Sequence, residues 1–280
     1  MNKGILYMII AGFLFATMNV FVKMLLNIPA IEIVFFRSLI SFVMSFFYLK
    51  AIRVPVMGNN KKLLIARGAV GAVALTMYFY TLQNIPLGSA VTMQFLSPIF
   101  TSILGIFIVK EKVHLKQWIF YMMAFAGLII IQGFDPRISI QMFAIGIGSS
   151  IMAGLAYNII RKINKTEHPL VIVFYFPLVT TPLTGLYSAF NWIMPAGEEW
   201  LILLAIGVLT QFAQYFMTMS YQSEDLSKVA SLKYLTIVYA LGYGYVFFDE
   251  TYNWIVFSGI ALILAGVILN VWFKNKIGKA

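Results

Sequence analysis

Long apolar runs alternate with short polar connections along the whole chain. Ten runs of about 20 residues consist mainly of Leu, Ile, Val, Phe, Ala and Met, and an α-helix of that length crosses the hydrocarbon core of a bilayer. Membrane-spanning β-strands are shorter, about 9–11 residues, and alternate apolar with polar side chains, which these runs do not. The pattern predicts an all-α integral membrane protein with ten transmembrane helices at residues 4–25, 31–50, 64–83, 88–109, 116–133, 141–160, 169–189, 200–219, 226–247 and 252–273.

Composition and charge indicate the orientation of these helices. The chain is 61% hydrophobic and 11% charged, and it has no cysteine, which excludes disulfides. With the N-terminus in the cytoplasm, 15 of the 20 lysines and arginines fall in cytoplasmic segments, four fall within helices, and only Arg137 falls outside. This asymmetry follows the positive-inside rule and predicts that both termini are cytoplasmic, with 274–280 a basic tail. The net charge of +10 therefore reports orientation, and we expect no nucleic-acid partner.

The chain aligns with itself without a gap when it is shifted by 139 residues. Two five-helix repeats result, at 1–133 and 140–273. Because five is an odd number, the second repeat enters the membrane from the opposite side, and inverted repeats of this kind are typical of secondary transporters that bind substrate between the repeats near the bilayer midplane. Shared apolar composition would not align polar residues in one register, yet the matched pairs include Asn19 with Asn158, Lys23 with Lys162, Gln83 with Gln222 and Glu111 with Glu250.

Small and polar side chains recur at helical spacing on several predicted helices, and such faces line the interior of membrane bundles. We expect a substrate cavity there, in which cationic side chains neutralise the substrate, amides hydrogen-bond to it, and tyrosines stack on any aromatic part. The candidate substrate-binding residues are Lys233, Arg37, Gln94, Asn19, Asn158, Tyr78, Gln211, Gln214, Tyr234 and Tyr239.

Some of these residues have a second interpretation. Lys233 shares a helix face with Ala240 and Gly244, but it lies near enough to a helix end for its side chain to extend to the membrane surface. Arg37 could form a structural ion pair with Glu32, although a spacing of five residues is unfavourable on a helix. The two asparagines could equally hold helices together through hydrogen bonds.

All ten carboxylates lie in connections or near helix ends. Proton and cation pathways through a bundle usually use a buried carboxylate. With positive charge but no acid in the expected cavity, the sequence favours a secondary transporter for a small anionic or zwitterionic, amino-acid-like metabolite. The alternatives are an efflux carrier for multiple drugs or cationic solutes, and a passive channel. The expected setting is a bacterial cytoplasmic (inner) membrane, with the chain a monomer or homodimer.

Other chemistry finds no support in the sequence. An HExxH motif, a pair of intramembrane aspartates, a serine nucleophile with a membrane histidine and a Walker motif are all absent, and His114 and His168 both lie in connections. We therefore expect no enzyme activity, no metal and no cofactor.

Five further residues are expected to shape the helices rather than bind substrate. Each of the two glutamates in this group follows a long apolar run, at the end of the fourth or the ninth helix, and is expected to organise the turn into the next helix. The proline and the glycines are expected to act as hinges or to permit close packing. The set is Pro98, Gly105, Gly244, Glu111 and Glu250.

The segment LSPIFTSILGIFIVKEKVHLKQWIFYMMAFAGLIII at 96–131 and its counterpart DETYNWIVFSGIALILAGVIL at 249–269 resemble the drug/metabolite transporter superfamily, EamA-like branch. The resemblance covers the whole chain, and the matching features are Pro98, Glu111, Glu250, the Ala–Gly pairs at 126–127 and 265–266, and Arg37. It implies a central cavity walled by helices 1–4 and 6–9, peripheral helices 5 and 10, and alternating access to small metabolites, often amino acids and commonly as export. The chain departs from the family pattern at Ile237, where the second repeat usually has a proline, and at Lys233.

Overall fold

The computed structural model describes residues 3–110, 113–163, 166–223 and 231–277, and all regular secondary structure in these ranges is helical. Nine spans there are long and apolar enough to cross a membrane, and a shorter apolar helix at Leu232–Phe248 makes a tenth. The predicted number of spans is confirmed, although residues 226–230 of the ninth lie outside the described ranges. The elements are α1 (Lys3–Met24), α2 (Ala30–Ala51), α3 (Lys61–Asn84), α4 (Leu87–Gln94), α5 (Ser97–Ile108), α6 (Leu115–Phe134), α7 (Ile140–Ile163), α8 (Pro169–Phe190), α9 (Glu199–Ser223), the 3-10 helix η1 (Ser231–Tyr234), α11 (Leu235–Phe248) and α12 (Trp254–Ile277).

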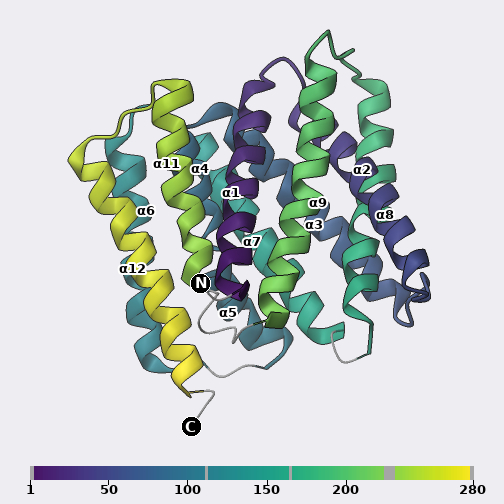
Figure 1. The fold of residues 1–280 in the computed structure, drawn as a ribbon. Helices are drawn as coiled ribbons and strands as arrows, with labels where there is room; N and C mark the ends of the chain where they lie inside the picture. The colour runs from purple at the N-terminus through teal and green to yellow at the C-terminus, as the bar shows by residue number, and fades with distance from the viewer. Residues whose placement is uncertain (1–2, 111–112, 164–165, 224–230, 278–280) are drawn as a thin grey trace.

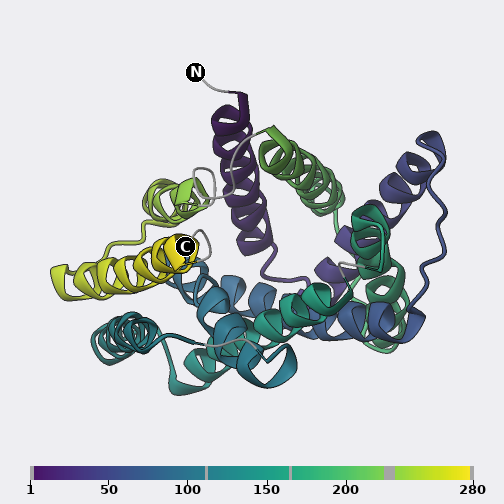
Figure 2. The same ribbon diagram turned by 90° about the horizontal axis from the view of Figure 1, so that it is seen from below.

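The helices stand side by side in a bundle, and α1 begins at the end of the bundle where α12 finishes (Figure 1). We call this the terminal end, and the opposite one the distal end. Seen from the terminal end, α6 and α12 lie together at one edge and α2 and α8 lie at the other (Figure 2). An even number of spans requires both termini to lie on one side, whereas the side that they face stays a prediction.

The helix pairs that pack together correspond to each other under the 139-residue offset. α1 packs along α9 and α7 packs along α3, and the offset exchanges these two pairs. It also relates two tight contacts between α6 and α12. A Cβ atom on Gly127 would collide with the carbonyl oxygen of Gly259, and one on Gly266 would lie 2.5 Å from the carbonyl oxygen of Phe120. The two helices pack backbone to backbone, which only glycine permits at these positions.

The fourth predicted span, 88–109, is present but consists of two helices. α4 ends at Gln94, and α5 begins at Ser97 with Pro98 in its first turn. Pro98 has no N–H to donate to the carbonyl of Gln94, and its ring would clash with that carbonyl in a continuous helix. A proline is tolerated in a first helical turn, where no intrahelical donor is needed. The apolar pattern did not reveal the interruption because the connecting residues, Phe95 and Leu96, are themselves apolar.

The second repeat changes its helix geometry at the matching position without a proline. The 3-10 helix η1 gives way to α11 at Leu235, and the offset matches Tyr234 to Phe95. Ile237 stands opposite Pro98 and keeps its backbone N–H. A proline is therefore not required for this irregularity. A short 3-10 segment within a membrane span often marks a hinge.

Apolar packing is concentrated in two clusters of buried side chains. The larger joins the helices around the middle and distal end of the bundle and includes Ile33, Leu96 and Ile237. The smaller ties α2, α3, α7 and α8 together near the terminal end, through residues such as Leu64 and Phe174.

Candidate substrate site

Arg37 is buried inside the bundle, with only 7% of its surface exposed. Its Nε donates a hydrogen bond to Thr210 Oγ1 of α9 at 3.2 Å. Its guanidinium carbon lies 5.8 Å from the ring centroids of Phe79 on α3 and of Phe176 on α8. The alternative ion pair with Glu32 does not form; Glu32 Oε2 instead accepts a backbone hydrogen bond from the α8–α9 connection. Arg37 therefore projects among four helices, as its position on the small and polar face of α2 predicts.

A second arginine, which is not among the candidate substrate-binding residues, lies beside the same ring. The guanidinium carbon of Arg67, on α3, is 4.6 Å from the ring centroid of Phe176. The sequence does carry a signal for Arg67, since it is one of the four charges within helices and falls in the apolar run 64–83. A single sequence places such a charge in the membrane but does not show which neighbouring helix it faces.

The predicted amide and tyrosine residues are distributed over several contacts between helices. Asn19 of α1 is buried, and its side chain lies beside the hydroxyl of Tyr78 on α3, so these two candidates are brought together, although Asn19 Oδ1 itself has no hydrogen-bond partner. Asn158 of α7 donates to the carbonyl oxygen of Thr101 on α5 at 2.9 Å. This bond corresponds to the second interpretation of the asparagines, in which they hold helices together. Gln94 accepts from the hydroxyl of Ser149 on α7 at 2.9 Å.

The remaining candidates on α9 line the same side of that helix but make weaker contacts. Gln211 is half-buried, and its Nε2 is 3.4 Å from the hydroxyl of Ser45, a long hydrogen bond. Gln214 is also half-buried, and its backbone carbonyl accepts a bond from the hydroxyl of Thr218. Both side chains therefore keep donor and acceptor capacity for a ligand.

Lys233 and its aromatic neighbours lie in a different part of the bundle from Arg37. Lys233 is half-buried in η1, which packs against α1 and α11. The side chain of Lys233 interacts with at least one other residue. Tyr234 is buried against the ring of Phe95, and Tyr239 packs edge-on against Phe13 of α1. The contacts of Arg37 come instead from α3, α8 and α9. The two predicted cationic residues thus lie against different helices.

Glu250, which is expected to organise the turn into α12, also connects the two halves of the chain. Its carboxylate is 3.0 Å from Lys23 Nζ and accepts the backbone N–H of Leu87 at 2.8 and 3.0 Å. Leu87 opens α4, whose first N–H groups have no partners within the helix and attract a negative charge. Gly244 leaves room for the Glu250 carboxylate, since a Cβ atom at this position would lie 2.5 Å from Glu250 Oε2. Glu111, the counterpart of Glu250, lies outside the described residues.

Lys23, Gln83, Glu250 and Tyr252 form a network of polar contacts at the distal end of the bundle, which we call the distal closure. The Lys23 ammonium also donates to the carbonyl oxygen of Ile85 at 2.6 Å, and Tyr252 donates its hydroxyl hydrogen to Glu250 at 3.1 Å. Gln83 ties the α1–α2 connection to α3 by donating to the carbonyl oxygen of Ile28 at 2.8 Å. These contacts hold the distal ends of α1, α3, α4 and α11 together.

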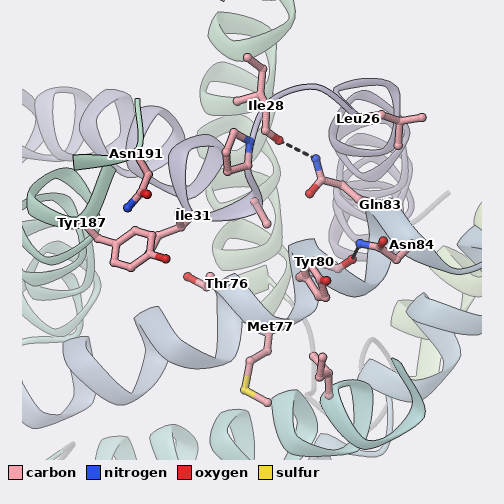
Figure 3. Close-up of a pocket in the computed structure, with 13 residues that line it drawn as sticks. Leu26, Ile28, Ile31, Thr76, Met77, Tyr80, Gln83, Asn84, Tyr187 and Asn191 are labelled. Atoms are coloured by element: carbon pink, nitrogen blue, oxygen red, sulfur yellow. Dashed lines mark hydrogen bonds between the residues drawn. The ribbon is translucent and has the colours of Figure 1, made fainter. Parts of the chain in front are cut away.

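Two cavities open near this closure. The larger, of about 800 Å³, lies between the α1–α2 connection, the distal part of α3, and α7 and α8 (Figure 3). Tyr80, Tyr187, Asn84 and Asn191 lie on its walls, and none of the candidate substrate-binding residues lines it. The other, of about 590 Å³, surrounds Lys23 and residues near Glu250. The cavities lie at one end of the bundle and are separate from the arginines at Phe176.

The side chains in the interior of the bundle determine what kind of molecule it could recognise. Within the described ranges, no group of three or more His, Asp or Glu side chains could hold a metal ion. What the interior provides is positive charge, amide groups and aromatic rings. This combination suits noncovalent recognition of a small polar molecule.

Comparison with known proteins places the chain among membrane transporters. The sequence profile of the EamA-like transporter family matches residues 2–133 and again residues 141–272. The pseudopaline exporter CntI of Pseudomonas aeruginosa is 30% identical over 271 residues, which cover 96% of this chain and 95% of that protein. The S-adenosylmethionine uptake transporter of Rickettsia prowazekii is 24% identical over 76% of this chain and 72% of its own length.

A solved crystal structure shares the fold over nearly the full length. It has a TM-score of 0.67 and 17% identity, and the match covers 98% of each chain. Together with the family profile, which matches almost the entire sequence in two copies, these relatives identify a multi-pass membrane transporter rather than an enzyme. The chain belongs to the EamA-like transporter family.

Proposed function

We propose that this chain is a secondary carrier that exports a small anionic or zwitterionic, amino-acid-like metabolite across the cytoplasmic membrane of a bacterium. Transport would proceed by alternating access between two inverted five-helix repeats, with both termini in the cytoplasm. Monomer and homodimer are both compatible with this proposal.

The burial of Arg37 inside the bundle is the observation that carries the proposal. A cation at this depth is costly and is usually retained for a ligand or a partner. Thr210 supplies one neutral hydrogen bond, and the two aromatic rings supply only their faces. A substrate carboxylate would supply the missing negative charge in a bidentate pair with the guanidinium.

The direction of transport is supported by one relative and by no contact in the structure. CntI, which the chain matches along nearly its whole length, is an exporter, whereas the Rickettsia relative is an uptake carrier. Since one alternating-access cavity can serve either direction, export is proposed from the former, more similar protein. A cationic solute at this position would meet the like charge of Arg37, which no carboxylate neutralises by an ion pair in the described ranges.

A ligand screen followed by transport assays tests this function. Purified protein is scanned for thermal stabilisation by amino acids, organic acids, nucleotides and amines, since a ligand at 100 times its Kd stabilises a protein by about 2.7 kcal/mol. Hits are then measured by counterflow in proteoliposomes. We expect saturable counterflow of an anionic or zwitterionic solute that Arg37→Gln and Lys233→Gln reduce, while Arg161→Gln, at the exposed end of α7, leaves it unchanged. Counterflow of amines alone would exclude the proposal.

A further inference from the structure

Two guanidinium groups from different helices converge on one aromatic ring. The guanidinium carbon of Arg67 lies over the ring of Phe176 at 4.6 Å from its centroid, and that of Arg37 lies at 5.8 Å. The three residues come from α2, α3 and α8, which pack against one another. Both groups are thus within reach of a single small molecule lying beside the ring.

Much of the hydrogen-bonding capacity of this pair is unused. Arg37 Nη1 and Arg67 Nε and Nη1 are all buried and have no hydrogen-bond partner in the structure. A guanidinium carries five N–H donors in a fixed plane, and a ring face does not accept most of them. Buried donors without partners are uncommon and call for a ligand, a water or an ion.

In the described ranges, no acidic side chain forms an ion pair with either of the two arginines. Glu250 pairs with Lys23 and Asp135 pairs with Arg137, both outside this junction. Glu32 is bonded to a backbone N–H in the α8–α9 connection. The two arginines therefore place two like charges at one ring with no carboxylate paired to either, in an interior where charges are weakly screened.

We propose that Arg37 and Arg67 together bind a substrate that carries two negative charges, one opposite each guanidinium. The inference rests on the proposed function and narrows its substrate class from anionic or zwitterionic solutes to dianions, with dicarboxylates as the expected form. A monocarboxylate leaves one guanidinium uncompensated. A zwitterion with a single carboxylate also brings its ammonium group close to a cation.

Binding measurements on purified protein in nanodiscs test this directly. The probes are succinate and glutarate as dicarboxylates, butyrate as a monocarboxylate of matched length, and inorganic phosphate as a compact dianion. We expect wild-type protein to bind a dicarboxylate at least about tenfold more tightly than butyrate, since a second charge-assisted pair contributes that much. Tight binding of phosphate but not of either dicarboxylate would assign the two charges to one phosphate group.

Matched substitutions separate the direct contribution of Arg67 to binding from the effect of removing one positive charge anywhere on the protein. Arg67→Gln should weaken dicarboxylate binding about ten- to a hundredfold and leave butyrate binding almost unchanged, because one of two charge-assisted pairs is removed. Arg67→Lys, which keeps the charge but not the planar fork, should retain part of the affinity. Arg161→Gln removes one positive charge at an exposed helix end and should have no effect.

The outcomes distinguish this inference from the proposed function. If the wild-type protein binds butyrate or a neutral amino acid as tightly as succinate, the dianion site is excluded, yet an anion or zwitterion carrier remains. If Arg67→Gln fails to fold, the ranking of probes on the wild-type protein still decides. If proteoliposomes move no anionic or zwitterionic solute, the proposed function itself is excluded.

Discussion

The ring centroids of Phe95 and Tyr234 lie 5.2 Å apart, with the ring planes at 51°. The two residues are 139 positions apart, which is the offset that aligns the halves of the sequence. Equivalent residues of two repeats touch only near the axis that relates them, so this contact marks where such an axis would pass. Each residue also adjoins a change of helix geometry, between α4 and α5 in the first half and between η1 and α11 in the second.

A cysteine cross-link tests whether the Phe95–Tyr234 contact must change during transport. Because the chain contains no cysteine, Phe95→Cys combined with Tyr234→Cys provides a clean background. We expect a short bifunctional thiol reagent to join the two positions and to stop counterflow in proteoliposomes, since the link fixes the repeats at their centre. Each single variant treated with the same reagent should retain most of its flux. A double variant that is fully cross-linked by mass spectrometry but transports normally would show that the contact is static.

The carboxylate of Glu250 should contribute more to stability than its acidic neighbour. Glu250→Gln removes the ion pair to Lys23 and weakens the bonds to the first N–H of α4, and we expect a loss of about 1–3 kcal/mol, as for other charge-assisted hydrogen bonds. Asp249→Asn is the control, since Asp249 is exposed and has a positive φ of 51° that asparagine also tolerates. Thermal unfolding in detergent, monitored by tryptophan fluorescence, gives the Tm of each of the two variants. Equal shifts in Tm would mean that Glu250 acts only as surface charge.

The sequence predicted the spans well because apolar length alone determines whether a helix crosses a membrane. It could not predict the contacts of Glu250 with Lys23 and Leu87, because these depend on how segments far apart in the chain pack. For the same reason, Arg67 is recognisable as a charge in the membrane but not as a neighbour of Arg37. The repeat in the sequence does indicate one contact between segments that are far apart in the chain. The 139-residue offset alone pairs Phe95 with Tyr234, and these two rings are in contact in the fold.

Tyr252 should make the stability of the distal closure depend on alkaline pH. Burial and the neighbouring charge of Glu250 raise the pKa of the Tyr252 phenol well above its usual range, while Arg137, whose own pKa is raised by Asp135, opposes this in part. A phenol with a raised pKa in the folded state contributes stability that is fully present below pH of about 10 and lost above it, at up to about 1.4 kcal/mol per pH unit.

The comparison with Tyr252→Phe isolates this effect from the other tyrosines. Near pH 8 the variant should be less stable by about 1–3 kcal/mol, because the bond to the Glu250 carboxylate is lost. Between pH 10 and pH 11 the difference in Tm should shrink, since only the wild-type protein has this phenol to deprotonate on unfolding. Parallel Tm curves for the two proteins from pH 8 to pH 11 would contradict the assignment.

The backbone contact between α6 and α12 should make one glycine of α6 essential and leave another replaceable. A methyl group at Gly127 would collide with the carbonyl oxygen of Gly259, whereas a methyl group at Gly133 would meet no atom within 4 Å. We expect Gly127→Ala to destabilise the protein by about 1–3 kcal/mol, because the helices must separate to admit the methyl group. Gly133→Ala should be neutral or stabilising by up to about 1 kcal/mol, the gain in helix propensity. Thermal unfolding of the two variants side by side decides the matter, and a Gly127→Ala protein as stable as Gly133→Ala would show that α6 and α12 are free to move apart.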